Sequence, residues 1–134
     1  MLFRSRYPIL LDLFRISACH VYLTYPFVLS WSLIEAMSTG ALVAASDTAP
    51  VREVIEDGSN GLLFDFFDEA TLVDRVCEAL ARPDAFNSIR QRARATAVNR
   101  YDLRSICLPR QIALVNAVAA GRLPPGGQDF NRGR

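Results

Sequence analysis

The chain has 134 residues, 51% of them apolar and 22% charged, and its formal net charge is +1. These totals are typical of one ordinary globular domain with its own core, and they exclude a disordered or fibrous chain. The charge pattern contains no long run of one sign and gives no indication of nucleic-acid binding, because such modules usually carry a basic stripe.

The N-terminal part of the chain predicts a helix followed by a strand. Apolar residues recur at helical spacing after a proline, which predicts an amphipathic helix over residues 8–18. HVYLTY, residues 20–25, is a short apolar and β-branched run that ends at Pro26. Such a run predicts a strand that is buried on both faces.

The middle of the chain predicts two further strands separated by a short helix. SLIEAMSTG, residues 32–40, predicts a helix that stops at its glycine, and ALVAAS, residues 41–46, predicts a second buried strand. DTAPVREVIEDG, residues 47–58, predicts a turn and a short helix with a proline near its start. GLLFDF, residues 61–66, predicts the third strand.

The C-terminal part of the chain predicts only helices. Acidic residues open a predicted helix over residues 68–83, and alanine- and arginine-rich residues 86–100 predict another. A last helix is expected over residues 103–120. Residues 121–134 contain glycine, proline and charge but few core residues, which predicts a disordered tail.

Strands that alternate with helices through short connections predict an α/β fold with a parallel sheet. Right-handed crossovers place the three strands side by side in chain order. We therefore expect a partial Rossmann-like parallel sheet of about three strands, with flanking helices and additional C-terminal helices, over residues 1–120.

Metal sites, disulfides and membrane spans are not expected. Cys19, Cys77 and Cys107 lie far apart and lack a C-x-x-C spacing, so buried thiols in a reducing cytosol are the better interpretation. The apolar residues 7–14 are interrupted by Asp12, and no window approaches the roughly 18 apolar residues of a membrane span. The sequence predicts a cytoplasmic protein without a metal, a cofactor or a transmembrane segment.

The loop after the first strand is the strongest candidate for a ligand site. In open α/β sheets, ligands bind beyond the carboxyl ends of the strands. YPFVLSWSLIEAM, residues 25–37, runs from a strand end into a helix start, where free N–H groups and the helix dipole favour a phosphate. The loop lacks the glycines of a G-x-G-x-x-G turn or a Walker loop.

The run SWSLIEAMSTGALVAASDTAPVREVIEDGSNGLLF, residues 30–64, resembles the C-terminal signature of the family-4 retaining glycosyltransferases. The resemblance extends over roughly residues 18–82 and rests on the order of several separate motifs. It implies a GT-B fold and a UDP- or GDP-linked sugar as the donor. It also implies transfer to an acceptor hydroxyl with retention at the anomeric carbon and without a required metal.

The resemblance assigns roles to individual residues. Glu35 matches the second glutamate of the family's E-x7-E element, which hydrogen-bonds the nucleotide ribose; a carboxylate suits two neighbouring hydroxyls because it only accepts hydrogen bonds. Glu53 matches a glutamate that shapes the pocket. The positions whose family counterparts hold the donor diphosphate and sugar through backbone amides are Leu29, Ser30, Trp31 and Ser32. No catalytic residue is assigned.

Phe27 departs from the family pattern. It lies eight positions before Glu35, where the family has a glutamate that contacts the donor sugar, and phenylalanine accepts no hydrogen bond. Val28 and Ser30 replace the glycines that normally follow, so the backbone approaches a ligand less readily. We interpret Phe27 as a subfamily feature of the donor-sugar site.

Several of these residues have alternative structural explanations. Ser32 and Glu35 fit an S-x-x-E capping box, and Trp31 either stacks on a sugar or base or packs in the core. Glu53 fits favourable electrostatics at a helix start. His20 has no neighbouring nucleophile, so a proton-transfer role is not assigned. A solvated helix face, with a lipid or nucleic-acid contact as the alternative, is expected for Arg90, Arg92, Arg94 and Arg100.

The resemblance covers only the end of a donor-binding domain. Three of six strands are expected, without the acceptor domain or the Arg/Lys pair that neutralises the diphosphate, so the chain alone should be inactive. The alternatives are a noncatalytic interaction or oligomerisation module derived from such an enzyme and a fragment of a GT-B nucleotide-sugar epimerase. Because the strand over residues 20–25 lacks its usual neighbour, we expect it to form an exposed edge that supports a homo-oligomer.

Overall fold

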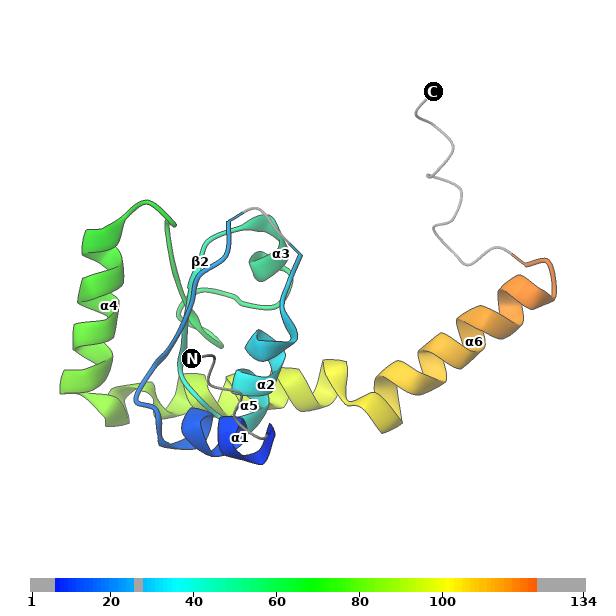
Figure 1. Ribbon diagram of the computed structural model, residues 1–134, viewed down its shortest axis with the longest axis horizontal. Coiled ribbons are helices and arrows are strands. Elements are labelled where there is room, and N and C mark those ends of the chain that lie inside the picture. Colours follow the sequence, from blue (N-terminus) through cyan, green and yellow to red (C-terminus); the bar gives the residue numbers. More distant parts are fainter. Residues whose placement is uncertain (1–6, 26–27, 123–134) are drawn as a thin grey trace, which may run out of the picture. The chain divides into compact units, whose positions relative to one another are not determined.

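The computed structural model describes residues 7–25 and 28–122 (Figure 1). Its sheet contains three parallel strands in the order β1-β2-β3, which are β1 (His20–Tyr22), β2 (Val43–Ser46) and β3 (Leu62–Phe64). The register pairs His20 with Val43 and Ala44 with Leu62. The predicted α/β fold with a sequential parallel sheet is confirmed, although each strand is shorter than its predicted run.

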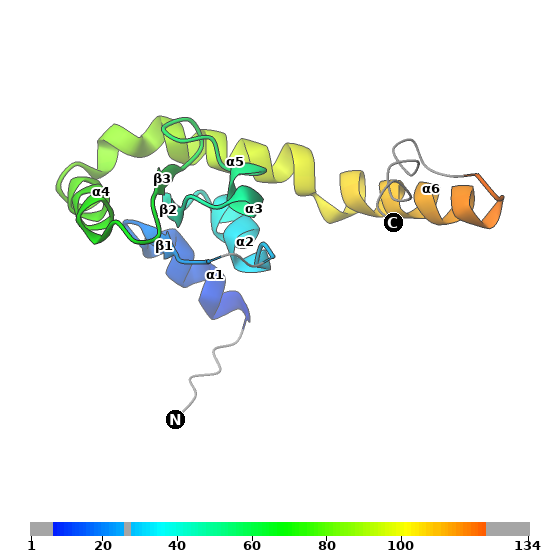
Figure 2. The same cartoon turned by 90° about the horizontal axis from the view of Figure 1, so that it is seen from above.

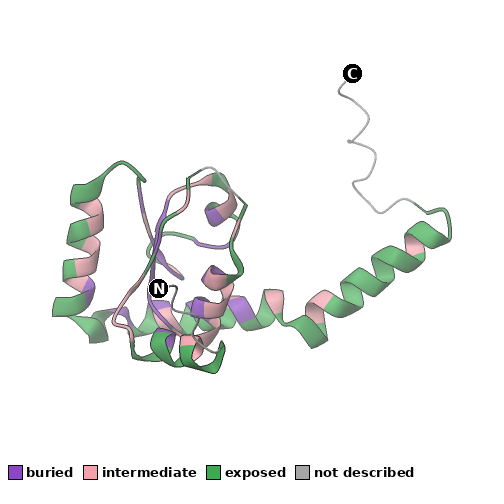
Figure 3. Cartoon of the chain, in the orientation of Figure 1, coloured by how far each residue is buried: buried purple, intermediate pink, exposed green. Residues whose placement is uncertain are grey.

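Helices cover both faces of this sheet (Figure 2). The helix α4 (Glu69–Ala81) lies on one face, and α2 (Trp31–Thr39) and the short α3 (Ala49–Arg52) lie on the other. The helix α1 (Tyr7–Ile16) packs against α2. Figure 3 shows that β2 is buried along its length, and all four of its residues are inaccessible to solvent.

Local signals place most of the helix ends where the sequence predicts them. The glycine after α2, Gly40, has a φ of 79°, the left-handed conformation that glycine adopts without strain. Asp68 caps α4 by accepting a hydrogen bond from the Thr71 amide. Pro50 lies in the first turn of α3, but this helix already ends at Arg52.

The prediction that β1 is buried on both faces is wrong. It lies at the edge of the sheet, with β2 as its neighbour. Val21 is 37% exposed and Leu23, just beyond the strand, is 55% exposed. Apolar composition alone does not bury a strand, because burial also requires elements that cover its faces. The exposed edge itself agrees with the sequence-based expectation.

Of the four arginines predicted to form a solvated face on α5 (Asn87–Tyr101), Arg92, Arg94 and Arg100 are exposed as expected, and Arg90 is partly buried. This helix follows a 3-10 turn (Pro83–Phe86) and runs beneath the amino ends of the strands in Figure 1. Arg90 donates to the carbonyl of Ala18 and Arg94 to that of Ser38. Arg92 donates to the carbonyl of Ser59 over 2.6 Å. These three guanidinium groups therefore satisfy carbonyls at the ends of other elements, whereas the Arg100 guanidinium lies over the Tyr101 ring at 5.5 Å.

Contacts divide the chain into two compact units, Met1–Asn99 and Arg100–Arg134. In the second unit, the helix expected over residues 103–120 consists of a π-helical turn (Leu103–Cys107) and α6 (Leu108–Ala119). Of the tail predicted for residues 121–134, only residues 121 and 122 lie within the described part of the chain.

The three cysteines are free thiols, as expected, and burial raises the pKa of Cys19. The prediction of buried thiols is wrong for Cys77, which is exposed on α4, and Cys19 and Cys107 are only partly buried. Among the residues described, no three histidine, cysteine or carboxylate side chains gather in an arrangement suited to a metal ion. None of the helices in residues 7–25 and 28–122 combines the length and the apolar character needed to span a bilayer.

Candidate functional site

The candidate site lies at the carboxyl edge of the sheet, where β1 leads toward the start of α2. The chain that leaves β1 is fixed at two points. The Ser46 hydroxyl at the end of β2 donates to the Thr24 carbonyl over 2.6 Å and accepts from the Thr24 amide over 2.9 Å. The Tyr22 hydroxyl accepts from the Ser30 amide over 2.8 Å. These buried side chains therefore set where the helix start lies relative to the sheet.

The first turn of α2 differs from the capping box that the sequence predicts for Ser32 and Glu35. The N-cap of the helix is Ser30, whose hydroxyl accepts from the Ser32 amide at 3.4 Å. Ser32 is already the second residue of the helix, so a carboxylate that completed a capping box would belong at Leu33. The capping explanation for Glu35 is consequently wrong, because its carboxylate does not cap this helix.

The four amides assigned to the donor diphosphate and sugar divide into two pairs. The Ser30 and Ser32 amides already donate within the chain. For the Leu29 and Trp31 amides, the described residues provide no acceptor. A helix start with uncommitted N–H groups stabilises an anion through those donors and the helix dipole.

Glu35 lies one helical turn after Trp31 and is half-buried. The phenol of Tyr7 on α1 lies beside it: desolvation, and then the hydrogen bond and negative charge of Glu35, raise the pKa of Tyr7. The Glu35 carboxylate therefore lies near a hydroxyl group, which is the kind of group a ribose would offer. Trp31 is 83% exposed, so the prediction that it packs in the core is wrong.

The structure does not place the other two predicted site residues at the start of α2. Phe27 lies outside the described residues. Glu53 is exposed at the C-terminal cap of α3, so favourable electrostatics at a helix start does not explain it. The neighbouring Arg52 pairs with Asp47, and its guanidinium holds the pKa of that carboxyl below the ordinary value.

The Asn-Gly pair of the sequence signature has a structural role at the opposite edge of the sheet. Asn60 is buried and bridges the turn before β3 to Thr96 on α5. A Cβ atom on Gly61 would lie 2.8 Å from Cγ2 of Ile55, which is closer than side-chain carbons pack. His20 lies at the amino end of β1, where its ring contacts Phe14 at 4.8 Å and burial lowers its pKa. None of these residues reaches the candidate site.

Sequence reasoning missed Tyr22 and Ser46, whose hydroxyls hydrogen-bond to the segment between β1 and α2. It also missed a cluster of aromatic side chains. Tyr25 after β1 contacts Phe66 and Phe67 after β3. About forty residues separate the two segments, and only the parallel register of the sheet brings them together. The sequence offered one signal for this contact: both segments follow predicted parallel strands, whose carboxyl ends lie at the same side of the sheet.

The family described as glycosyl transferases group 1 matches residues 2–96 of the chain. A phosphatidyl-myo-inositol mannosyltransferase of Mycobacterium leprae is 43% identical over 70 residues, which are 52% of this chain and 18% of that protein. The putative glycosyltransferase EpsD of Bacillus subtilis is 28% identical over 78 residues, which are 58% of this chain and 20% of that protein.

Solved structures resemble the fold as well. Anabaena Alr3699/HepE in complex with UDP has a TM-score of 0.71 at 23% identity, and the match covers 80% of this chain and 29% of that protein. TarM has a TM-score of 0.55 at 27% identity, with 63% of this chain and 17% of TarM covered. The chain therefore spans less than a third of the length of each of these proteins.

Proposed function

The chain belongs to the glycosyl transferases group 1, and from this membership we propose that it forms the nucleotide-sugar-binding part of a family-4 enzyme that acts with retention. The observation that carries the proposal is the start of α2, where the Leu29 and Trp31 amides lack acceptors among the described residues and Glu35 follows one turn later. The structural neighbour solved with UDP supports a UDP- or GDP-linked donor.

The residues at the carboxyl ends of the strands have separate roles in the proposal. The Leu29 and Trp31 amides, which lack acceptors among the described residues, hold the diphosphate, and Glu35 accepts hydrogen bonds from the ribose hydroxyls. Glu53 shapes the pocket wall, and the exposed Trp31 offers apolar surface to the donor sugar. Phe27, outside the described residues, is assigned to the donor-sugar site by its position in the sequence. The diphosphate departs as the sugar passes to an acceptor hydroxyl, and charge stabilisation of this leaving group assists the step.

The proposal assigns donor binding to this chain and the transfer step to a complete enzyme. Because the chain spans less than a third of its relatives, the proposal places the acceptor-binding domain and the cations that neutralise the diphosphate in other parts of such an enzyme. The proposed location is the cytoplasm, where thiols such as the exposed Cys77 stay reduced. The epimerase alternative is less well supported, because the single histidine, His20, lies at the amino end of β1.

Calorimetric titration with UDP and GDP tests the donor site. We expect one of them to bind and Glu35→Gln to weaken its binding about tenfold, because the neutral amide replaces charge-assisted hydrogen bonds to the ribose. Glu56→Gln is the matched control, since it removes the same charge from the exposed turn before β3. Failure of both nucleotides to bind would refute the proposal, and equal affinity in Glu35→Gln would remove Glu35 from the site.

The polypeptide by itself should form a homo-oligomer through the edge of β1, because an exposed edge presents unpaired backbone groups to a second chain. Light scattering on the chain at tens of micromolar should give the mass of a dimer or a larger species. A lysine at Val21, which is partly exposed on the edge strand, should shift the protein to a monomer. Val28→Lys, at a 70% exposed position outside the strand, should leave the mass unchanged. A monomeric wild-type chain contradicts this prediction.

A further inference from the structure

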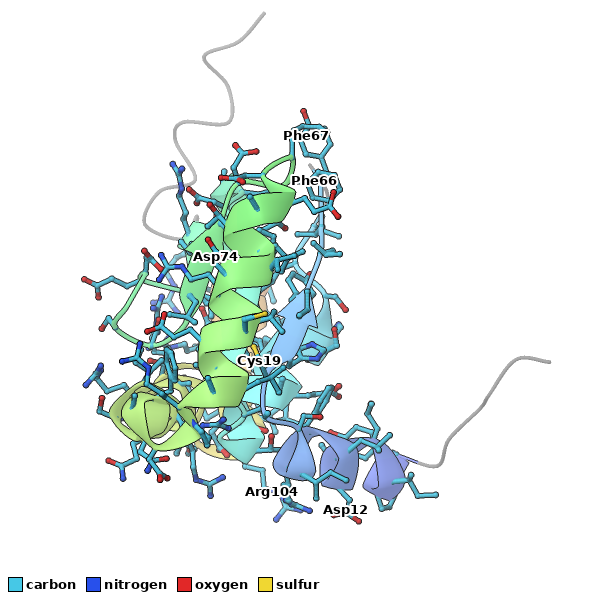
Figure 4. All side chains as sticks on the ribbon, turned by 90° about the vertical axis from the view of Figure 1, so that its left-hand side faces the viewer. Asp12, Cys19, Phe66, Phe67, Asp74 and Arg104 are labelled. Atoms are coloured by element: carbon cyan, nitrogen blue, oxygen red, sulfur yellow. The ribbon has the colours of Figure 1, made fainter. Side chains whose placement is uncertain are left out.

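Three aromatic side chains form an exposed cluster at the carboxyl edge of the sheet. The ring centroids of Tyr25, Phe66 and Phe67 lie 5.1 Å apart in all three pairs. The exposed fractions are 57% for Tyr25, 37% for Phe66 and 74% for Phe67. Figure 4 shows Phe66 and Phe67 together at the end of the molecule where α4 begins. The rings thus contact one another while leaving a large apolar surface toward solvent.

Hydrogen bonds in the segments that carry the rings fix the position of the cluster. The Asp65 carboxylate accepts from the Phe67 amide over 2.8 Å, and the Asp65 carbonyl accepts from the Asp68 amide over 3.0 Å. Asp68 in turn accepts from the amide and hydroxyl of Thr71. Tyr25 directly follows Thr24, which Ser46 holds. A ligand would therefore meet a preformed surface and would lose little binding energy to ordering the rings.

The charges beside the cluster select the class of ligand. Exposed carboxylates next to the rings in sequence belong to Asp65, Asp68 and Glu69. Arg52, the cation of the turn after β2, is already paired with Asp47, whose amide donates to the carbonyl of Phe64. Such a rim repels phosphates and anionic lipid surfaces. It suits a neutral, polyhydroxylated molecule, whose hydroxyl groups donate to carboxylates.

We propose that the cluster of Tyr25, Phe66 and Phe67 is a stacking platform for a neutral saccharide. One face of a sugar ring carries C–H groups that pack on an aromatic surface, while its hydroxyls reach the carboxylates of Asp65 and Glu69. Identification of that saccharide as part of the acceptor rests on the proposed function, whereas the platform itself follows from the geometry and charge of this edge.

Titration of the isotope-labelled chain with neutral trisaccharides tests the platform. The probes are mannotriose, maltotriose and cellotriose, and amide chemical shifts are followed. We expect saturable shifts at the amides of Phe66 and Phe67 with at least one probe. Phe67→Ala should weaken its binding about fivefold or more, which is the size of one lost ring contact, and Phe67→Tyr should retain it. Leu80→Ala, which removes an exposed apolar side chain at the far end of α4, should bind as the wild type does.

Other outcomes refute specific parts of the inference. The platform is refuted if none of the three probes causes saturable shifts, or if Phe67→Ala binds as tightly as the wild type. Binding of the cluster to vesicles that contain phosphatidylglycerol, or loss of its exposure in a dimer, refutes the saccharide as its occupant. UDP binding without saccharide binding refutes the platform alone, and saccharide binding without UDP or GDP binding refutes the donor site alone.

Discussion

Replacing Asn60 by alanine should lower the free energy of unfolding by about 3 kcal/mol, because three hydrogen bonds of a buried amide disappear. Its Oδ1 accepts from the Glu56 amide over 2.8 Å, and its Nδ2 donates to the Val54 carbonyl over 3.0 Å and to the Thr96 hydroxyl over 3.1 Å. Asn60 is 8% exposed, so water cannot easily replace these partners. Of the contacts described between the turn before β3 and α5, the hydrogen bond from Arg92 to the Ser59 carbonyl remains after this loss.

Urea unfolding, followed by far-ultraviolet circular dichroism at a fixed protein concentration, measures this loss. The matched control is Asn87→Ala, at an exposed position at the start of α5, which should change the unfolding free energy by less than about 0.5 kcal/mol. Asn60→Asp retains an acceptor for the Glu56 amide but places a carboxylate oxygen against the Val54 carbonyl, so it should not restore stability. An Asn60→Ala protein as stable as Asn87→Ala would show that this bridge contributes nothing to the fold.

The features predicted correctly from the sequence are those that local chemistry determines. Gly40 ends α2 because its left-handed conformation suits a helix terminus, and Asp68 begins α4 by accepting a hydrogen bond from the Thr71 amide. The apolar run of β2 predicts a strand buried on both faces, and both faces are covered by helices. Each of these signals acts within a few residues of the chain.

The features that were missed or predicted wrongly depend on which distant segment meets a residue. Arg92 and Arg94 are exposed, as predicted, but their spacing does not reveal that each donates to a carbonyl at least thirty residues away. Ser32 satisfies the pattern of an N-cap, but the actual cap is Ser30, whose position depends on the hydroxyl of Tyr22. Spacing along the chain carries no information about these partners.

The amino and carboxyl ends of the strands consequently present different chemical groups. At the amino edge, the guanidinium groups of α5 occupy the carbonyls of Ala18, Ser38 and Ser59, so those groups are committed to the fold. At the carboxyl edge, the Leu29 and Trp31 amides lack acceptors among the described residues, and the rings of Phe66 and Phe67 are exposed. The edge with uncommitted groups is the one where open α/β sheets bind ligands.

Replacing Ser46 by alanine should lower the free energy of unfolding by about 2 kcal/mol and loosen the carboxyl edge. The Ser46 hydroxyl is fully buried and pairs with both backbone groups of Thr24, two residues beyond the last paired residue of β1. Alanine fits the space but leaves the Thr24 amide and carbonyl without this partner. The damage should be local, because the pairing of β1 with β2 remains.

Hydrogen exchange separates this local effect from general destabilisation. The Thr24 amide should exchange about tenfold faster, or more, in Ser46→Ala, which corresponds to a loss of about 1.4 kcal/mol of local protection. The exchange rate of the Ala45 amide, within β2, should rise no more than the loss of global stability accounts for. Ser88→Ala, at an exposed position on α5, should leave both rates unchanged. If the Thr24 amide keeps its protection in Ser46→Ala, the hydroxyl of Ser46 does not hold the segment that leads to the start of α2. The Tyr22–Ser30 hydrogen bond is then the remaining described contact that fixes the start of α2 relative to β1.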